Sequence, residues 1–397
     1  MEDSLNRISP KLKSAIAFVI LLSIVDLLAD FTYEGARSAA GPFLAFLGAS
    51  GTVVGVTAGL GELFGYGLRL VSGTVADRTH RYWLVAISGY VINLFSVPLL
   101  AFAGHLPLAV VLLIAERTGR AIRVPARDAM LSHATHEMGR GWGFGLHEAM
   151  DQAGAVMGPL LIAFVLSTKS DYRLGFGLLA IPAVLAVTTL IGASRLFPRP
   201  DHLEVRKIEG RVEGLGSAYW TFLAAAGLIA AGYADFSLMA FHLEKSSAIA
   251  SARIPIYYAL GMGTHALAAL GFGRLYDAKG LKVLTIGVAA SCLFAPLVFW
   301  GGPAMILLGI AIWGVGLGAV ESLMRAAVAD MSPTERRGTS FGIFNAGYGI
   351  LWFLGSAVMG WLYDRSITSL VVFSVVLQLA SLPLIMLAHR RFNAESS

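Results

Sequence analysis

Residues 116–130, ERTGRAIRVPARDAM, combine four arginines and two carboxylates between two apolar runs. A charged side chain in hydrocarbon costs several kcal/mol, so such residues face a partner or a cavity. On a helix that turns about 100° per residue, the charges fall within an arc of roughly 140°, which leaves the opposite face apolar. This stripe consists of Glu116, Arg117, Arg120, Arg123, Arg127 and Asp128.

The depth of each arginine suggests its role. Arg117 and Arg120 are the deeper pair, and we expect them to contact either an anionic group of a solute or a structural carboxylate. Arg123 and Arg127 come closer to the end of the segment. There we expect salt bridges of a gate, or contacts with lipid headgroups.

A second polar stripe lies near the N-terminus, within an arc of about 100°, and consists of Asp26, Asp30, Tyr33, Glu34 and Arg37. A carboxylate in a dehydrated cavity favours its neutral form and can exchange a proton for a cation or a solute. We therefore expect Asp30 and Glu34 to couple protons to transport. A permanent Glu34–Arg37 ion pair is the alternative.

Three other apolar segments carry pairs of ionisable residues on one face. They are Asp235 with His242, Glu321 with Arg325, and His147 with Asp151. Asp151 is a third candidate for proton coupling, because its depth matches that of Arg117 and Arg120 and favours a buried contact with one of them.

The composition places the chain in a membrane. Of 397 residues, 56% are hydrophobic and 14% are charged, and the mean hydropathy is +0.70. Soluble domains carry about 25% charged residues. Apolar segments of roughly 20 residues, enough to cross about 30 Å of hydrocarbon as a helix, recur throughout, whereas alternating strands do not. We expect an all-α membrane protein.

Charge, glycine and proline separate twelve predicted transmembrane helices, at 14–46, 50–72, 83–103, 107–130, 142–166, 173–194, 217–243, 253–273, 281–300, 303–329, 339–363 and 367–388. With both termini in the cytoplasm, 18 of the 30 lysines and arginines fall in cytoplasmic segments. Only five fall in loops outside, namely Lys169, Arg173, Lys245, Arg253 and Arg365. This excess inside supports the count and a multi-pass protein of the cell (inner) membrane.

The sequence repeats itself after about two hundred residues. Gly73–Arg81 (GTVADRTHR) corresponds to Gly273–Gly280 (GRLYDAKG), and Ala29–Thr32 (ADFT) corresponds to Ala234–Ser237 (ADFS). Between the copies, 195–216 is the longest polar stretch. We expect an N-terminal bundle at 1–194, a cytoplasmic linker at 195–216 and a C-terminal bundle at 217–397.

The repeated segment resembles the signature G-x-L-A-D-R-x-G-R-[RK] of the major facilitator superfamily, and the resemblance covers the whole chain. The matching residues are Gly73, Asp77, Arg78 and Arg81, and the second copy keeps Gly273, Asp277 and Gly280. Val75, His80 and Tyr82 depart from the pattern. The resemblance implies two six-helix bundles, with this loop as a charge latch that holds the outward-open form.

The segment 142–166 resembles the antiporter motif of the family through Gly145, Gly154, Gly158 and Pro159. Ile162 and Ala163 stand where that motif has two glycines. The motif implies exchange of a solute for protons. The alternative is a face of small residues that packs against another helix.

The family architecture also places four helices around a central cavity. On this basis the candidate substrate-binding residues are Asp30, Tyr33, Glu34, Arg37, Arg117, Arg120, Asp235, His242, Glu321 and Arg325. We expect a secondary transporter that moves a small polar or charged organic solute by alternating access, by proton-coupled efflux, and that acts as a monomer. The alternatives are proton-coupled import of an anionic or zwitterionic metabolite, and transport of a lipid or lysolipid.

Other functions lack the residues that they need. The sequence contains no phosphate-binding Gly-x4-Gly-Lys-Ser/Thr loop, no nucleophile–base pair and no spacing typical of a metal site. We therefore expect no enzyme, cofactor or metal. The net charge of +5 reflects the cytoplasmic loops rather than binding of nucleic acid.

Overall fold

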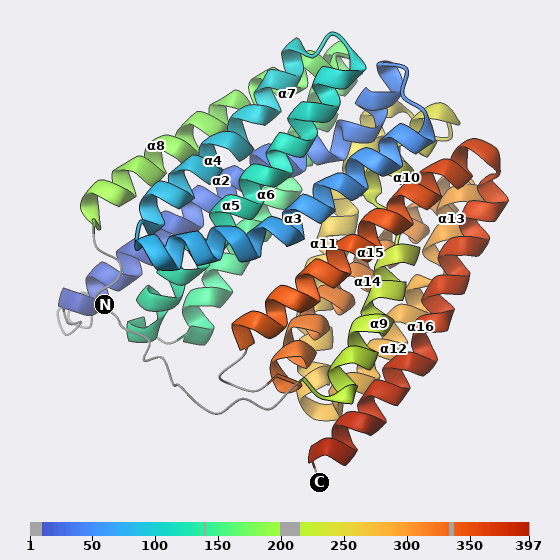
Figure 1. The fold of residues 1–397 in the computed structure, drawn as a ribbon. Helices are drawn as coiled ribbons and strands as arrows, with labels where there is room; N and C mark the ends of the chain where they lie inside the picture. The colour runs from blue at the N-terminus through green and yellow to red at the C-terminus, as the bar shows by residue number, and fades with distance from the viewer. Residues whose placement is uncertain (1–9, 139, 199–214, 333–336, 397) are drawn as a thin grey trace, which may run out of the picture.

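The computed structural model describes residues 10–138, 140–198, 215–332 and 337–396, and all regular structure in these ranges is helical (Figure 1). The N-terminal half contains α2 (Pro10–Phe46), α3 (Gly51–Thr79), α4 (Tyr82–Leu99), η1 (Leu100–Phe102), α5 (Leu106–Met138), α6 (Arg140–Lys169), α7 (Tyr172–Leu178) and α8 (Ala180–Leu196). The C-terminal half contains α9 (Ser217–Gly232), α10 (Phe236–Lys245), η2 (Ser251–Arg253), α11 (Ile254–Lys279), η3 (Gly280–Lys282), α12 (Val283–Ser291), α13 (Phe294–Trp300), α14 (Pro303–Asp330), α15 (Arg337–Arg365) and α16 (Ile367–Ser396). Each predicted span corresponds to one helix or to a consecutive pair, namely α7–α8, α9–α10 or α12–α13.

Nine helical stretches of the described chain are long and apolar enough to cross a membrane. One of them, Ser251–Trp300, spans 50 residues and contains both α11 and α12–α13. Neither α3 nor α5 is among the nine. Both helices carry charged residues that face the interior of the molecule, so hydropathy alone does not identify them as spans.

The helices α3 and α11 end at equivalent points of the two signature copies. Gly280 (φ 68°) and His80 (φ 53°) both have positive φ. An L-residue with a side chain adopts the left-handed conformation at a cost of about 1–2 kcal/mol. This explains why the signature has glycine where the chain has His80, and histidine is among the residues that tolerate the conformation.

The helical path of the seventh span breaks at residues 233–235, between α9 and α10. The Asp235 carboxylate accepts a hydrogen bond from Ser237 N at 2.8 Å and so caps α10. The indole of Trp313 donates to the carbonyl of Ala234 at 3.1 Å. Non-helical backbone at membrane depth is tolerated where protein groups satisfy it. The break turns Asp235 toward α2.

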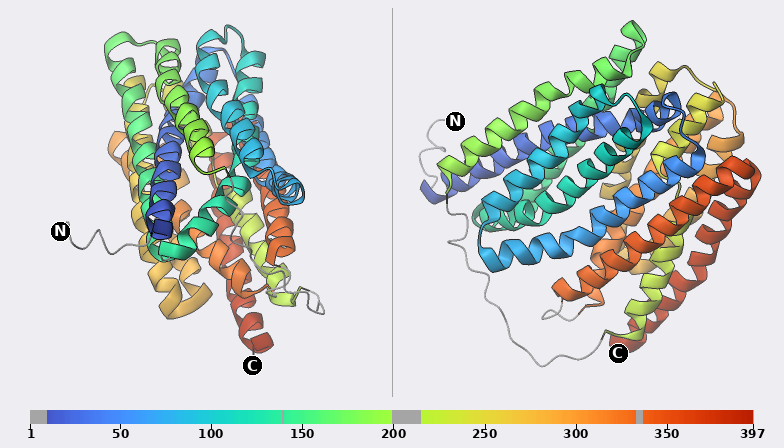
Figure 2. Two further views of the ribbon diagram at one scale, coloured as in Figure 1. Left: turned by 90° about the vertical axis from the view of Figure 1, so that its left-hand side faces the viewer. Right: turned by 45° about the horizontal axis from the view of Figure 1, so that its top comes forward.

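The two halves lie side by side and spread apart at the end that carries both termini (Figures 1 and 2). α3 packs along α15, α6 along α11, and α10 along α2. At the opposite end the backbones of the halves touch, since a Cβ on Gly41 would lie 2.0 Å from Ser237 O. The domain boundaries stay a prediction, and residues 199–214 of the expected linker lie outside the described ranges.

Within the N-terminal half, α2 and α6 approach each other through glycines. A Cβ on Gly154 would lie 2.2 Å from Leu27 O, and one on Gly158 would lie 2.1 Å from Phe31 O. Small residues at such positions let membrane helices pack closely. Helix packing therefore accounts for two glycines of the span-5 motif.

We expect Gly158→Val to lower the thermal unfolding temperature in detergent, because the new methyl groups collide with the α2 backbone. Overpacking of this kind costs about 1–3 kcal/mol or more. Gly145→Val is the matched control, since no described atom lies within 4 Å of a Cβ at Gly145. Equal effects of the two substitutions would contradict the packing role.

Candidate functional site

A cavity of about 320 Å³ lies between the two halves. α2, α3, α5 and α6 supply most of its charged lining. α14 and α15 supply an aromatic wall made of Trp313, Phe341, Phe344, Tyr348 and Trp352. Asp128, Glu148 and Arg325, at the end nearest the chain termini, are exposed. The cavity therefore opens at that end.

The two polar stripes of the sequence meet in a buried cluster between α2 and α5. Asp26 Oδ1 accepts hydrogen bonds from Arg123 Nη1 at 2.5 Å and from the Tyr90 hydroxyl at 2.5 Å, and lies 3.0 Å from Arg127 Nη1. The Arg123 side chain is 1% exposed and also lies over the ring of Tyr90. Arg123 and Arg127 thus form salt bridges with Asp26, which is one of the two roles expected for them, and their depth relative to the membrane interface stays a prediction.

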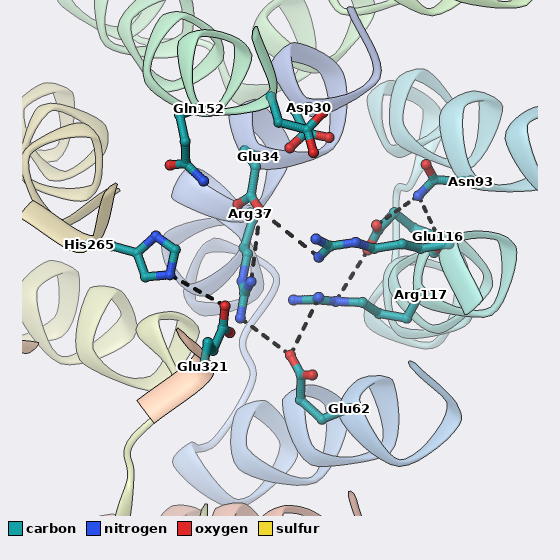
Figure 3. Close-up of polar contacts among 12 residues, drawn as sticks. Asp30, Glu34, Arg37, Glu62, Asn93, Glu116, Arg117, Gln152, His265 and Glu321 are labelled. Carbon is teal, nitrogen blue, oxygen red and sulfur yellow. Dashed lines mark hydrogen bonds and ion pairs between the residues drawn. The ribbon is translucent and has the colours of Figure 1, made fainter. Parts of the chain in front are cut away.

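A second network surrounds Glu62 of α3 (Figure 3). It lies nearer the closed end, which is the end where the backbones of the two halves touch. Glu62 Oε1 lies 3.3 Å from both Arg37 Nη2 and Arg117 Nη1. Arg37 Nη2 also donates to Asp235 Oδ2 of the other half at 3.0 Å. Arg117 further contacts Glu116, whose Oε1 accepts from Asn93 at 2.9 Å. Arg37 and Arg117 are thus held mainly by protein carboxylates.

Between these networks, Asp30 and Glu34 face the cavity with looser partners. Asp30 Oδ1 lies 3.7 Å from Arg123 Nη2, and Glu34 Oε1 lies 3.9 Å from Arg37 Nη1 and 4.0 Å from Arg120 Nη1. Charge-assisted hydrogen bonds are usually about 2.7–2.9 Å long. Glu34 also accepts a hydrogen bond from the hydroxyl of Tyr258, which belongs to the other half. The expected Glu34–Arg37 pair exists, but it is long.

Eight of the ten residues predicted to bind substrate line the cavity, namely Asp30, Tyr33, Glu34, Arg37, Arg117, Arg120, Glu321 and Arg325. Asp235 lies beyond Arg37, in a smaller pocket toward the closed end. His242 lies outside both pockets, beside Phe299, with its Nδ1 3.2 Å from the Tyr363 hydroxyl. The structure thus places His242 away from the cavity, because two further turns of α10 carry it past the lining residues.

Asp151 lines the cavity, but its arginine partner differs from the expected one. Its Oδ2 lies 3.9 Å from Arg127 Nη1 rather than near Arg117 or Arg120. Glu321 is paired with His265 at 3.3 Å, and Arg325 donates to the Glu321 carbonyl at 3.3 Å. Of the seven arginines that line the cavity, Arg69 and Arg325 are the two with no carboxylate of a described residue within 4.0 Å.

The whole chain matches a known family. The sequence pattern of the Major Facilitator Superfamily matches residues 22–356 and 238–395. The chain belongs to the major facilitator superfamily. It is therefore a multi-pass membrane protein and a secondary transporter rather than an enzyme, and the predicted fold of twelve helices in two bundles is confirmed.

Relatives of this transporter occur in bacteria and archaea. An uncharacterized protein of Mycobacterium tuberculosis is 42% identical over 376 residues, which cover 93% of this chain and 92% of the relative. An uncharacterized MFS-type transporter of Methanocaldococcus jannaschii is 25% identical over 378 residues, with coverage of 91% and 92%. Neither name states a substrate.

Solved structures share the fold at low sequence identity. A bacterial homolog of the human lysosomal transporter Spinster, in an inward-facing and occupied conformation, aligns with a TM-score of 0.75 at 16% identity, covering 98% of this chain and 99% of that chain. The nucleoside transporter NupG aligns with a TM-score of 0.74 at 14% identity, covering 94% and 99%. These likenesses concern the fold alone.

The superfamily signature lies at the open end of the transporter. Asp77, Arg78, Arg81 and Asp277 are exposed, and the carboxylate of Asp77, near the end of α3, accepts a hydrogen bond from the hydroxyl of Tyr82, the first residue of α4, at 3.1 Å. Gly73 packs beside Pro125, whose Cβ would lie 3.4 Å from a Cβ at Gly73. No ion pair joins these charges to another described residue. The latch role of the signature stays a prediction.

Sequence reasoning missed several partners in the site. Glu62 of α3 binds Arg37 and Arg117, which lie on two other helices. Tyr90 and Tyr258 carry no signal in the sequence, because an isolated tyrosine in an apolar helix is usually a packing residue. The spacing of Asp26 within the α2 stripe could have identified it as a partner of the α5 arginines.

We expect Asp26→Asn to destabilise the transporter strongly, because Arg123 and Arg127 then lack their main counter-charge. Breaking a buried ion pair costs about 3–5 kcal/mol. The double variant Asp26→Asn/Arg123→Gln should recover part of the loss in thermal unfolding temperature. Additive losses in the double variant would contradict a direct charge pairing.

Proposed function

We propose that this transporter moves a small polar or charged organic solute across the cell membrane by alternating access, as a monomer, and that Asp30 and Glu34 bind the coupling protons. The observation that carries the proposal is the position of Glu34. Its carboxylate lies between Arg37 and Arg120 of the cavity and accepts a hydrogen bond from Tyr258 of the other half. A change of its charge therefore acts on the solute site and on the contact between the halves at once.

The predicted orientation in the membrane indicates to which side the cavity opens. The cavity opens at the end that carries the termini, and the excess of basic residues there predicts that this end is cytoplasmic. The described conformation is then inward-facing, and the solute enters from the cytoplasm or leaves into it.

The sign of the solute's charge decides the mode of coupling. A cation competes with protons for Asp30 and Glu34, and that competition drives exchange and efflux. An anion binds more tightly once a proton neutralises the carboxylate beside an arginine, and this linkage drives cotransport. Efflux is what the resemblance of the Gly145–Pro159 segment implies, although packing against α2 explains Gly154 and Gly158.

Cotransport of an anion is the second candidate, and the loosely paired arginines favour it. Arg120 lies over the Tyr33 ring at 4.4 Å and Arg69 over the Tyr66 ring at 5.0 Å. Stacking fixes a guanidinium while its edge stays free to bind a carboxylate or phosphate. A lipid is favoured less, because a cavity of about 320 Å³ suits a small molecule.

We expect Asp30→Asn and Glu34→Gln each to reduce solute-triggered proton flux by about tenfold or more, which corresponds to roughly 1.4 kcal/mol at the coupling step. The measurement uses proteoliposomes with an internal pH probe and pooled organic solutes. Asp171→Asn, which changes a carboxylate at the closed end, is the control. The direction of proton flux relative to solute flux separates efflux from import. Unchanged proton flux in both variants would contradict the role of Asp30 and Glu34 in proton coupling.

We expect Asp364→Ala to shift the transporter toward the outward-open form. The Asp364 carboxylate joins the halves at the closed end, because it accepts from Gly51 N at 2.7 Å, Thr52 N at 2.8 Å and Thr52 Oγ1 at 2.6 Å. Losing a helix cap costs about 1 kcal/mol, or about a fivefold change in the equilibrium.

The shift is measured as the rate at which an impermeant thiol reagent, added outside, labels Asn345→Cys in the cavity of a Cys292→Ser protein. The control is Asp171→Ala, since Asp171 caps α7 within one half through Arg173 N. Equal labelling rates in the two variants would contradict a role for Asp364 in closure.

A further inference from the structure

Three acceptor atoms meet between α2 and α6, beside the solute cavity. One ligand atom each from Asp26, His147 and Asp151 lies within 4.8 Å of the others. Asp26 is fully buried and His147 is 5% exposed. Asp26 Oδ2, His147 Nε2 and Asp151 Oδ1 are buried atoms without a hydrogen-bond partner. Buried polar groups are nearly always paired, so unpaired ones require an explanation.

The neighbouring serine determines which nitrogen of His147 carries a hydrogen. The Ser23 hydroxyl donates its only proton to the carbonyl of Val19 at 2.8 Å. Its oxygen, 3.3 Å from His147 Nδ1, must then accept a hydrogen bond from that nitrogen. In the neutral ring Nε2 therefore bears a lone pair, and this lone pair faces Asp26 Oδ2 at 3.6 Å.

We infer that this cluster is a proton-binding site of the transport cycle, in which Nε2 of His147 takes up a proton and donates it in a hydrogen bond to Asp26 Oδ2. The inference rests on the proton coupling proposed above and adds His147, acting with Asp26, to the candidates Asp30, Glu34 and Asp151. The three acceptors repel one another until one of them is protonated. Asp151 lines the cavity, so a proton reaches the cluster from the solute path.

The surrounding charges tolerate a protonated His147. α2 contributes Asp26 and Asp30, α5 contributes Arg123, Arg127 and Asp128, and α6 contributes Glu148 and Asp151. Tyr90 of α4 reaches the cluster only through Asp26. Five carboxylates thus surround two guanidiniums, and this excess of negative charge offsets part of the cost of burying a positively charged ring. The same two guanidiniums disfavour a divalent metal ion at this place.

Arg127 connects the cluster to the solute cavity. Its Nη1 lies 3.0 Å from Asp26 Oδ1, its Nη2 lies 2.8 Å from Asp128 Oδ1, and the residue lines the cavity. A protonated His147 gives Asp26 another cationic partner and weakens its hold on Arg127. Arg127, which keeps its contact with Asp128, is then free to turn toward the solute. Protonation of His147, which lies outside the cavity lining, thereby changes how much of the positive charge of Arg127 is available to the solute.

The direct test is nitrogen NMR of the full-length transporter in nanodiscs, labelled with 15N-histidine and titrated with acid in the absence of solute. The spectrum of His147→Gln identifies the ring-nitrogen resonances of His147. The matched control is His242→Gln, which removes a ring that is hydrogen-bonded to Tyr363. We expect a bare Nε2 in alkaline buffer that gains a proton in acid. Ser23→Ala should disturb the tautomer, because it removes the acceptor of the Nδ1 hydrogen.

The transport test measures how proton flux depends on pH in His147→Gln and Asp151→Asn, and we expect both to flatten this dependence while His242→Gln preserves it. An Nε2 that stays bare in acid, or that changes only when Zn2+ is added and reverts with EDTA, would overturn the inference. Protonation of Nε2 without any solute-driven proton flux would refute the proposed coupling instead. The two failures are thus distinguishable.

Discussion

The structure depends on one constraint, the burial of a charged α5 inside a membrane-embedded bundle. Four arginines on this helix need counter-charges, and α2 and α3 supply most of them through Asp26, Asp30, Glu34 and Glu62. An unpaired charge at this depth costs several kcal/mol. The position of α5 between these helices is therefore set by electrostatics as much as by packing, and the cavity is the space that the paired side chains leave.

Close contact between helix backbones at glycine residues provides the second constraint. Close backbone contacts at Gly154 and Gly158 hold α6 against α2, and Gly41 lets the two halves touch at the closed end. The polar contacts between the halves are few by comparison, and those in the described residues include Arg37–Asp235, Tyr258–Glu34 and Asp364 with the start of α3. Contacts of this kind can break and re-form during a transport cycle, because water can replace each partner once the interface opens.

Much of this arrangement could be predicted from the sequence, for physical reasons. Polar stripes on apolar helices indicate which face of α2 and α5 turns inward, and basic residues in loops indicate orientation. The sequence does not indicate which stripe residues pair, because pairing depends on the rotation and depth of helices far apart in the chain. Arg37 meets Asp235, 198 positions away, only because the chain breaks at 233–235. The same break, with the α10 turns after it, carries His242 out of the cavity.

The strength of pairing separates the carboxylates that hold arginines in place from those proposed to bind protons. Asp26 binds two arginines and a tyrosine through one oxygen, and Glu62 bridges two arginines. Both carboxylates therefore balance the permanent positive charge of their arginines. Asp30, Glu34 and Asp151 have guanidinium contacts of 3.7–4.0 Å and face the cavity. A carboxylate with a loose partner loses less when it is neutralised, and it is reached by solute and proton alike. The tight pairs thus fix the geometry within which the loosely paired groups can change their charge.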